Sequence, residues 1–340
     1  MLNETNESAL RVPILRDAGE FGAIDRFAQK LEVRAGVRVG IGDDCAVLEP
    51  LQAPVVSCDA LVEGVHFRRD WTSAFQLGRK TLAVSVSDLA ASGARPVAAF
   101  LSLCAPPDLE LSWLDAFYEG MESFAREFNF SVAGGDTTRS NQLVLSATAL
   151  GELLPEARNQ PVLRCGARLG DLVCVTGDLG ASAAGLAWLL AGKNARTDAH
   201  HEVLSRHFDP MPRLRAMSAL LRANRSAVHA AMDVSDGFKG DAGHIAERSG
   251  VRLRIDANEL PVSNATREVA RELGLEAREL ALSGGEDYEL LLCLAPEALQ
   301  ELQLASRQSG VDVTRVGQVI QGEAGVEVMG ASEGKSWTHF

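Results

Sequence analysis

The sequence predicts an α+β protein with two domains, and three observations lead to this prediction. The chain has 340 residues, which is more than one hydrophobic core usually takes. Apolar residues make up 46% and charged residues 23% of the chain, as in ordinary globular proteins. Strand and helix patterns are mixed along the chain without a strict strand–helix alternation. We therefore expect α+β layers rather than a doubly wound parallel sheet.

The first half of the chain combines helical periodicity with short apolar runs that are typical of strands. Its predicted elements are helices over 19–31, 74–94 and 111–128, and strands over 55–59, 96–105 and, as two strands around a turn, 130–153. Residues 1–18 have little pattern. We assign 1–18 to a loose tail and 19–155 to an N-terminal domain that binds nucleotide and metal and forms a dimer.

A polar segment with two prolines and a Gly-Asp turn, at about 155–170, marks the expected domain boundary. Residues 283–294 are predicted to form a glycine turn that leads into a strand. The other elements predicted beyond the boundary are helices over 181–192, 241–250, 263–280 and 296–309, and strands over 171–177, 251–255, 313–320 and 325–329. Residues 156–340 are therefore assigned to a C-terminal domain that completes the site.

Charge and cysteine usage exclude several classes of protein. A net charge of −13 argues against a nucleic-acid or anionic-membrane surface, which would need a basic footprint. None of the six cysteines forms a C-x-x-C pair, which favours reduced thiols over disulfides or a zinc site. The N-terminus lacks the pattern of a signal peptide, and no apolar segment is long enough to span a bilayer. We expect a cytoplasmic protein.

Aspartates recur where an apolar strand ends or a helix begins. They are Asp43 and Asp44 in GIGDDCAVL, Asp59 in VVSCD, Asp88 in SVSDLAASGA, Asp136 in AGGDTTR, and Asp233 and Asp236 in MDVSDG. Each of these aspartates, taken alone, could also be an ordinary turn residue or helix cap with no functional role. Two carboxylates ~5 Å apart at an effective dielectric constant of ~20 repel by roughly 3 kcal/mol, so a converging set needs cations. Oxygen ligands favour Mg²⁺, which completes its shell with water and phosphates, so convergence would indicate phosphoryl transfer.

Several familiar motifs are absent. A Walker A sequence is missing, since the near match at 330–336 has one spacer too few, and no protein-kinase, H-E-x-x-H or G-x-S-x-G motif occurs. The turn at 175–186 fits a phosphate nest or close helix packing. Three histidines, His200, His201 and His207, lie in a polar stretch and are expected to be exposed. His66 follows Asp59 closely and is a better candidate for the site.

The ordered series of motifs resembles the bacterial thiamine-monophosphate kinase family. The matching segments are GIGDDCAVL, DALVEGVHF, KTLAVSVSDLAASGA, AGGDTTR, LRCGARLGD, VTGDLGASAAGL, MDVSDG and SGGEDYEL. The resemblance runs from about Gly19 to the end of the chain. It implies the fold of aminoimidazole-ribonucleotide synthetase, a homodimer formed through the N-terminal sheet, and ATP bound between the domains with several Mg²⁺ ions. It also implies transfer of the γ-phosphoryl group of ATP to thiamine phosphate.

The resemblance assigns roles to individual residues of this chain. The implied metal ligands are Asp44, Ser57, Cys58, Asp59, Asp88, Asp136, Asp233 and Asp236. The residues implied to contact ATP are Tyr118, Gly135, Asp136, Arg164 and Ser235. The residues implied to contact the thiamine moiety are His66, Glu286 and Trp337.

The chain departs from the family pattern at Cys58, where Thr is frequent. A thiol is a poor Mg²⁺ ligand, so the contact is kept if the family uses the backbone carbonyl at this position and lost if it uses the hydroxyl. No catalytic general base is expected, because a phosphate monoester is mostly a dianion at neutral pH. Two alternatives stay open. One is another ATP-using enzyme of the same superfamily, and the other is a non-catalytic dimer that binds nucleotide and metal.

Overall fold

The structure is a computed structural model that describes residues 12–330. The elements of its N-terminal part are α1 (Leu15–Ala28), β1 (Val37–Val39), β2 (Val47–Leu48), β3 (Pro54–Val62), α2 (Ala74–Ser92), β4 (Ala94–Ala105), α3 (Leu111–Glu127), β5 (Ser131–Arg139) and β6 (Val144–Leu153). The N-terminal sheet has four strands in the order β3-β6-β4-β5, and β1 and β2 pair separately.

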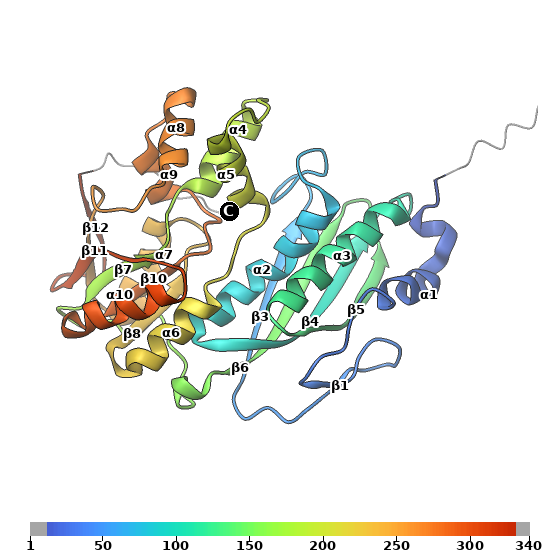
Figure 1. Ribbon diagram of the computed structural model, residues 1–340, viewed down its shortest axis with the longest axis horizontal. Coiled ribbons are helices and arrows are strands. Elements are labelled where there is room, and N and C mark those ends of the chain that lie inside the picture. The colour runs from blue at the N-terminus through green and yellow to red at the C-terminus, as the bar shows by residue number, and fades with distance from the viewer. Residues whose placement is uncertain (1–11, 331–340) are drawn as a thin grey trace, which may run out of the picture.

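The C-terminal part follows a short 3₁₀ helix, η1 (Pro155–Ala157). Its elements are β7 (Leu172–Thr176), α4 (Ala181–Leu190), α5 (Asp198–Phe208), α6 (Leu214–Asn224), η2 (Arg225–Ala227), β8 (Val228–Asp233), α7 (Phe238–Ser249), β9 (Arg252–Asp256), α8 (Asn264–Leu273), α9 (Ala277–Ser283), β10 (Leu290–Leu294), η3 (Pro296–Ala298), α10 (Leu299–Gln308), β11 (Val313–Ile320) and β12 (Gly325–Met329). Its sheet has six strands in the order β12-β9-β11-β7-β10-β8. Two mixed sheets with helices confirm the predicted α+β class (Figure 1).

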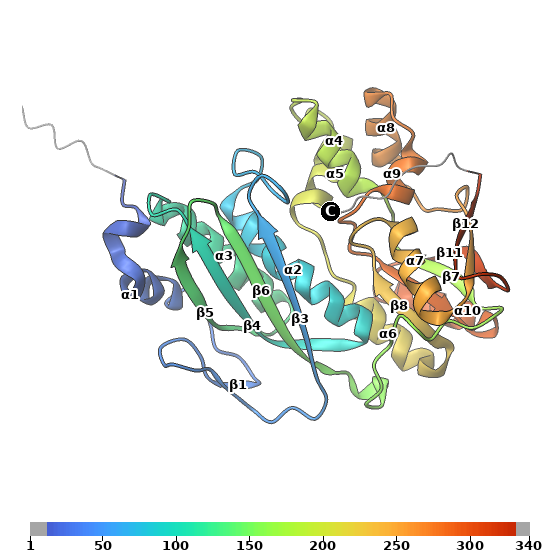
Figure 2. The ribbon, with the colours of Figure 1, turned by 180° about the vertical axis from the view of Figure 1, so that it is seen from behind.

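Helices α2 and α3 cover one face of the N-terminal sheet, and the opposite face is free of helices in the described chain (Figures 1 and 2). Residues of β6 alternate between buried and half-buried along the whole strand, as expected for a sheet covered on one side. Two glycines let α2 and α3 approach closely. A Cβ at Gly78 would lie 2.0 Å from the carbonyl oxygen of Phe117, and one at Gly120 would lie 2.0 Å from that of Phe75.

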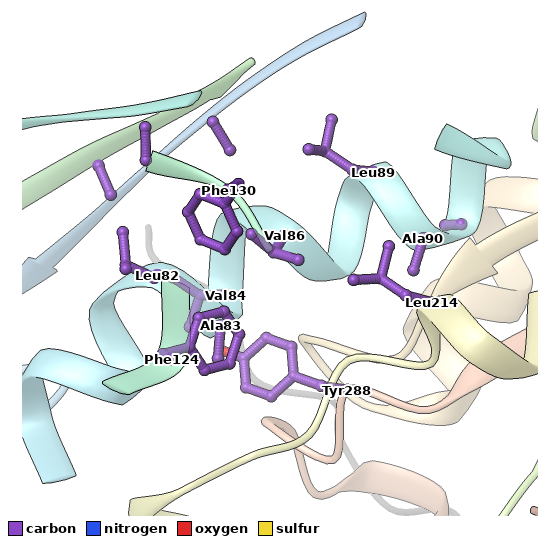
Figure 3. Packing of buried hydrophobic residues seen from close by; sticks show 14 of the residues in the cluster. Leu82, Ala83, Val84, Val86, Leu89, Ala90, Phe124, Phe130, Leu214 and Tyr288 are labelled. Carbon is purple, nitrogen blue, oxygen red and sulfur yellow. The ribbon is translucent and has the colours of Figure 1, made fainter. Parts of the chain in front are cut away.

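The C-terminal sheet is covered on both faces, so its central strands are buried throughout. Leu290 and Leu292 of β10 pack in the core that includes α6 and α10, and Leu291 and Cys293 pack in the core that includes α7. The first of these cores is continuous with the N-terminal core beneath α2. Helix α2 therefore packs against both domains, and the α6 residue Leu214 lies beside its C-terminal end (Figure 3).

The structure corrects several sequence-based expectations. Helix α1 begins at Leu15, inside the segment predicted as a loose tail, and it kinks at Gly19, where φ is 67°. The predicted helix over 263–280 is two helices, because α8 ends at Gly274 in the left-handed conformation. Helices α5 and α6 were not predicted.

The prediction for two of the three histidines was wrong. His200 and His207 of α5 are buried, with 3% and 4% of their surface exposed. His200 stacks on Trp188 of α4 with a centroid distance of 3.8 Å, which explains why a polar stretch can lie inside the fold. No helix within residues 12–330 is both long enough and apolar enough to cross a bilayer.

Candidate active site

Carboxylates from β3 and α2 meet beneath the N-terminal sheet. Side chains alternate along β3, so Ser57 and Asp59 share the face that α2 covers. The Ser57 hydroxyl donates a hydrogen bond to Asp88 of α2 and lies 3.4 Å from Oδ2 of Asp59. Burial raises the pKa of the Asp59 carboxyl, and the negative charge of Asp88 raises it further. These two aspartates therefore form one acidic cluster.

The C-terminal domain adds Asp233, the last residue of β8, to this acidic cluster. Its side chain is 3% exposed. Burial raises the pKa of the Asp233 carboxyl well above its ordinary range, and the negative charges of Asp88 and Asp241 raise it further. Asp88 and Asp233 also line one pocket of about 390 Å³ between the domains. Residues from three separate motifs thus lie together in the structure.

Two arginines line the same pocket as Asp88 and Asp233. They are Arg164, from the segment between the domains, and Arg248, near the C-terminal end of α7. An arginine is suited to bind phosphate oxygens with paired N–H donors. The pocket therefore combines carboxylates that could hold a cation with guanidinium groups that could hold a polyphosphate.

The MDVSDG turn between β8 and α7 is held by one buried carboxylate. Oδ2 of Asp241 accepts hydrogen bonds from the backbone N–H groups of Ser235 (3.0 Å), Asp236 (3.3 Å) and Gly237 (3.2 Å). The Ser235 carbonyl accepts a hydrogen bond of 2.7 Å from the backbone N–H of Glu286. This hydrogen bond joins the turn to the SGGEDYEL loop, so two motifs that are far apart in sequence lie side by side.

Glu286 lies in a charged cluster beside the acidic cluster. Its Oε2 accepts a hydrogen bond of 3.0 Å from Nζ of Lys80 and lies 3.3 Å from Nδ1 of His207. Burial raises the pKa of Glu286, but the positive charge of Lys80 and smaller effects of His207 and His66 outweigh it, so that the pKa lies below its ordinary value. Two of the three residues that the resemblance assigned to the thiamine moiety, His66 and Glu286, are therefore near enough for their charges to interact.

Tyr288 connects the Glu286 cluster with the acidic cluster. Its ring is directed toward Ala83 and Val84 of α2 (Figure 3). Burial raises the pKa of its phenol, and the negative charges of Glu286, Asp233, Asp59 and Asp88 raise it further. The phenol therefore stays protonated and can act only as a neutral hydrogen-bonding group between the two clusters.

Comparison with known proteins shows to which family the chain belongs. Residues 42–153 match the family model for the N-terminal domain of AIR synthase related proteins, and residues 168–329 match that for the C-terminal domain. A thiamine-monophosphate kinase of Aquifex aeolicus is 37% identical over 328 residues, which cover 96% of this chain and 99% of the relative. That of Escherichia coli strain K12 is 39% identical, covering 88% and 90%. The chain belongs to the thiamine-monophosphate kinase family.

Solved structures of the thiamine-monophosphate kinase family have the same fold. The enzyme from Stenotrophomonas maltophilia K279a superposes with a TM-score of 0.80 at 39% identity, covering 90% of this chain and 95% of that one. A structure described as AaThiL complexed with AMPPCP and TMP superposes with a TM-score of 0.75 at 36% identity, covering 96% and 98%. A family relative has therefore been seen with an ATP analogue and TMP bound together.

Other residues implied by the family resemblance are not joined to the acidic cluster in this structure. Asp44 and Asp136 are exposed, and Asp136 lies on β5, at the opposite edge of the sheet from β3. Tyr118 is buried and stacks on Phe27 of α1 at 4.2 Å. A Cβ at Gly135 would lie 1.9 Å from the carbonyl oxygen of Leu101, so close packing of β5 on β4 requires this glycine. Trp337 lies outside the described residues.

The side chain of Cys58 lies on the opposite face of the sheet from Ser57 and Asp59. It is exposed, and Oγ1 of Thr148 lies 3.4 Å from its sulfur. A thiol on that face cannot reach Asp59 and Asp88 under α2. A metal contact at this position would therefore have to use the backbone carbonyl.

The turn at 175–186, considered above as a phosphate nest, is capped by the protein itself. Oδ2 of Asp287 accepts a hydrogen bond of 2.7 Å from the N–H of Gly180, and Oδ1 one of 3.4 Å from that of Ser182. Burial raises the pKa of Asp287 to about 7. The Asp287 carboxyl group thus takes the N–H groups that a phosphate would need. This favours close helix packing as the reason for the glycines.

Sequence reasoning missed three residues of the site. Lys80 was assigned no role, although it lies about two helical turns before Asp88 in the same motif. His207 and Arg248 were assigned no role. Neither lies in a recognisable motif, and only the packing of α5 and α7 shows that they face the site.

Proposed function

We propose that this chain transfers the γ-phosphoryl group of ATP directly to thiamine monophosphate and releases thiamine diphosphate. The observation that carries the proposal is the pocket in which Asp88 of the N-terminal domain and Asp233 of the C-terminal domain meet beside Arg164. Support also comes from relatives that are thiamine-monophosphate kinases, and from the bound AMPPCP and TMP of one family structure.

We propose that Mg²⁺ is held mainly by Asp88 and Asp233, with Asp59 beside them as the resemblance implies. Within residues 12–330, no group of three or more His, Cys, Asp or Glu side chains is arranged so that it could hold a metal ion. The donor set still fits this ion, because Mg²⁺ is usually bound by one or two carboxylates together with water and substrate phosphates. The buried, mutually repelling carboxylates also need positive charge. When bound, Mg²⁺ would neutralise charge on the reacting phosphates.

Other metal ligands are proposed from the family resemblance. They are Asp44, Ser57, Asp136, Asp236 and the Cys58 carbonyl. Asp44 and Asp136 are exposed in this structure, so their participation would need the substrate or a second copy of the chain to complete their surroundings. The same resemblance proposes Tyr118, Gly135 and Ser235 as contacts of ATP.

The protein groups would act by binding and orientation. The acceptor phosphate has a second pKa of about 6 and is mostly a dianion at neutral pH, so no general base is required. Arg164 and Arg248 would hold phosphate oxygens at the pocket wall. His66 and Glu286 would orient the thiamine moiety, with Trp337 as a third contact. Transfer would depend mainly on positioning and charge stabilisation, as in other phosphoryl transfers.

We also propose a homodimer formed through the uncovered face of the N-terminal sheet (Figure 2). That face exposes apolar Val56 and Cys58 on β3 and half-exposed Phe100 on β4. Exposed apolar area on a sheet face is typical of an interface. Light scattering would test this: a mass twice that of the 36.3 kDa chain is expected, and a Val56→Glu variant should be monomeric. A wild-type monomer would contradict the proposal.

The proposed location is the cytoplasm. All six cysteines are free, and three of them, Cys45, Cys58 and Cys165, are exposed. Unpaired exposed thiols favour a reducing compartment. Fractionation of the source cells would test this location, and recovery of the protein outside the cytoplasm would contradict it.

The experiment that tests the proposed function is a product assay. Purified protein is incubated with ATP, Mg²⁺ and thiamine monophosphate, and thiamine diphosphate and ADP are quantified by chromatography. Equal amounts of both products are expected. ADP with no thiamine diphosphate would favour another ATP-using enzyme of the superfamily, and no turnover with intact nucleotide binding would favour a non-catalytic dimer.

A further inference from the structure

The charged cluster around Glu286 contains a cation that belongs to the protein. Nζ of Lys80 donates hydrogen bonds of 3.0 Å to Oε2 of Glu286 and 3.0 Å to the backbone carbonyl of His207. Lys80 is 3% exposed, so its ammonium group is fixed inside the fold and cannot move into solvent. A buried ammonium ion at this distance offsets the negative charge of Glu286.

His207 does not supply a second positive charge. Burial and the positive charge of Lys80 together lower the pKa of the His207 imidazole to about 4, against an opposing effect of Glu286, so the ring is neutral at pH 7. Its Nδ1 also lies 3.0 Å from the hydroxyl of Ser182. Glu286 and Lys80 together therefore form a pair with no net charge.

One oxygen of Glu286 remains available to a ligand. Oε2 is occupied by Lys80 and His207, whereas Oε1 accepts no hydrogen bond from any residue between 12 and 330. The Glu286 side chain keeps 23% of its surface exposed. Glu286 also has a φ of 63°, a conformation that non-glycine residues rarely adopt. Such backbone strain persists only where surrounding contacts hold it, and it is frequent at binding sites.

The position of Lys80 along α2 gives the direction of a bound substrate. Lys80 precedes Asp88 by eight residues in the same helix, a rise of about 12 Å. Thiamine monophosphate is linear, with the phosphate at one end, the cationic thiazolium in the middle and the aminopyrimidine at the other end. If the phosphate lies with Asp88 and Asp233, the aminopyrimidine is the part that extends toward Lys80 and Glu286.

We propose that Lys80 is a specificity-determining residue, which neutralises Glu286 so that this carboxylate recognises the exocyclic amino group of the pyrimidine and not the positive charge of the thiazolium. The inference rests on the proposed function and deepens it. Oε1 of Glu286 accepts a hydrogen bond from the amino group. The thiazolium is recognised by other features of the site.

The test compares three molecules with the wild-type protein. They are thiamine monophosphate, an analogue with an oxo group in place of the amino group, and an analogue with a neutral triazole in place of the thiazolium. Both kcat/KM and the calorimetric binding constant are measured for each. For the oxo analogue, kcat/KM and affinity should both fall by roughly 10²-fold, because a hydrogen bond to a charged group is lost. For the triazole analogue, kcat/KM and affinity should fall by less than about fivefold, because Lys80 already neutralises Glu286 and no ion pair with the thiazolium is lost.

The opposite order, with a large loss for the triazole and little for the oxo analogue, would overturn the proposal. That result would still leave the proposed function intact, provided that thiamine monophosphate itself is phosphorylated. Absence of turnover would refute the proposed function, and the three binding constants would then decide the inference.

A variant gives an independent readout that a merely structural role would not change. Lys80→Met removes the cation, and the measurement is made at about pH 8.5, roughly two units above the ordinary pKa of imidazole, so that His207 stays neutral. The preference for the thiazolium over the triazole should rise by roughly tenfold, because Glu286 is then unneutralised. Lys30→Met, which removes a lysine on the far side of the N-terminal domain, should leave the preference unchanged. An unchanged preference in a folded Lys80→Met protein would contradict the proposal.

Discussion

Asp88 and Asp233 come from different domains and line the same pocket, and the negative charge of Asp88 raises the pKa of Asp233. Helix α2 makes this possible, because it belongs to the N-terminal domain but packs against β8. Domain docking and site formation are therefore the same event. A substitution that separates α2 from β8 would therefore disrupt the site even if it replaced none of the residues that bind metal or substrate.

Replacing Asp88 with Asn should lower kcat by roughly 10²–10³-fold, because a carboxylate proposed to hold the charge-neutralising Mg²⁺ is lost. The change keeps the volume of the side chain and an acceptor for the Ser57 hydroxyl, so the fold should persist. Steady-state kinetics and circular dichroism would be compared with Asp108→Asn, a change at an exposed aspartate before α3. Undiminished turnover in Asp88→Asn would show that this carboxylate is not part of the reaction site.

Replacing Glu289 with Ala should destabilise the protein by about 3–5 kcal/mol, because a buried guanidinium loses its partner. Glu289 is fully buried, and it accepts hydrogen bonds from Arg213 and from the hydroxyl of Thr176. Chemical denaturation would measure the loss. The matched control is Glu327→Ala, which breaks the exposed pair with Arg254 and should cost less than about 1 kcal/mol. Equal losses in both variants would argue against a special role of the buried pair.

Replacing Gly78 with Ala should cost about 1–3 kcal/mol, because the new methyl group would press α3 away from α2. The control is Gly243→Ala in α7, where the added Cβ meets no atom within 4 Å. That change should be neutral or stabilising by up to about 1 kcal/mol, since alanine favours the helix. Thermal unfolding of both variants tests the pair. If Gly78→Ala were tolerated as well as Gly243→Ala, the close helix contact would be wrong.

Acid should destabilise the protein partly through His207. The pKa of His207 in the folded state is about 4, below the ordinary value of about 6.5, so the unfolded chain binds its proton first as pH falls. This contribution to stability is complete above about pH 6.5 and is lost as pH falls toward 4. It amounts to roughly 2–3 kcal/mol.

His207→Gln isolates this contribution from that of the many carboxylates. The difference in unfolding free energy between wild type and His207→Gln should change by this amount between pH 7 and pH 4.5, to the disadvantage of wild type at the lower pH. A difference that is constant across this range would mean that the imidazole is not buried in its neutral form.

The sequence was sufficient for the fold class and for the aspartates that could form an acidic cluster, but it left open whether they meet. Asp233 ends a buried strand, Asp88 lies in a largely buried helix and Asp59 lies on the helix-covered face of β3, and such positions are brought together by packing. Cys58 also follows a simple rule, because alternation along β3 places it opposite Asp59. The family resemblance added His66 and Glu286, which do lie near one another.

The residues that were missed are those whose role depends on tertiary packing. Lys80 and Glu286 are more than two hundred residues apart, and no local pattern links them. His207 was predicted to be exposed because α5 is mostly polar, yet the helix packs against α4 and α8. For Asp44 and Asp136, exposure in a single chain leaves their predicted roles to be tested with substrate and a second copy present.

The most direct test of the shared site is a crystal structure with Mn²⁺ in place of Mg²⁺, a non-hydrolysable ATP analogue and thiamine monophosphate. Anomalous scattering would locate the metal independently of the phosphates. The account predicts Mn²⁺ at about 2.1–2.2 Å from oxygens of Asp88 or Asp233 and of the triphosphate, with Arg164 on the nucleotide. Metal and triphosphate bound away from these aspartates would contradict it.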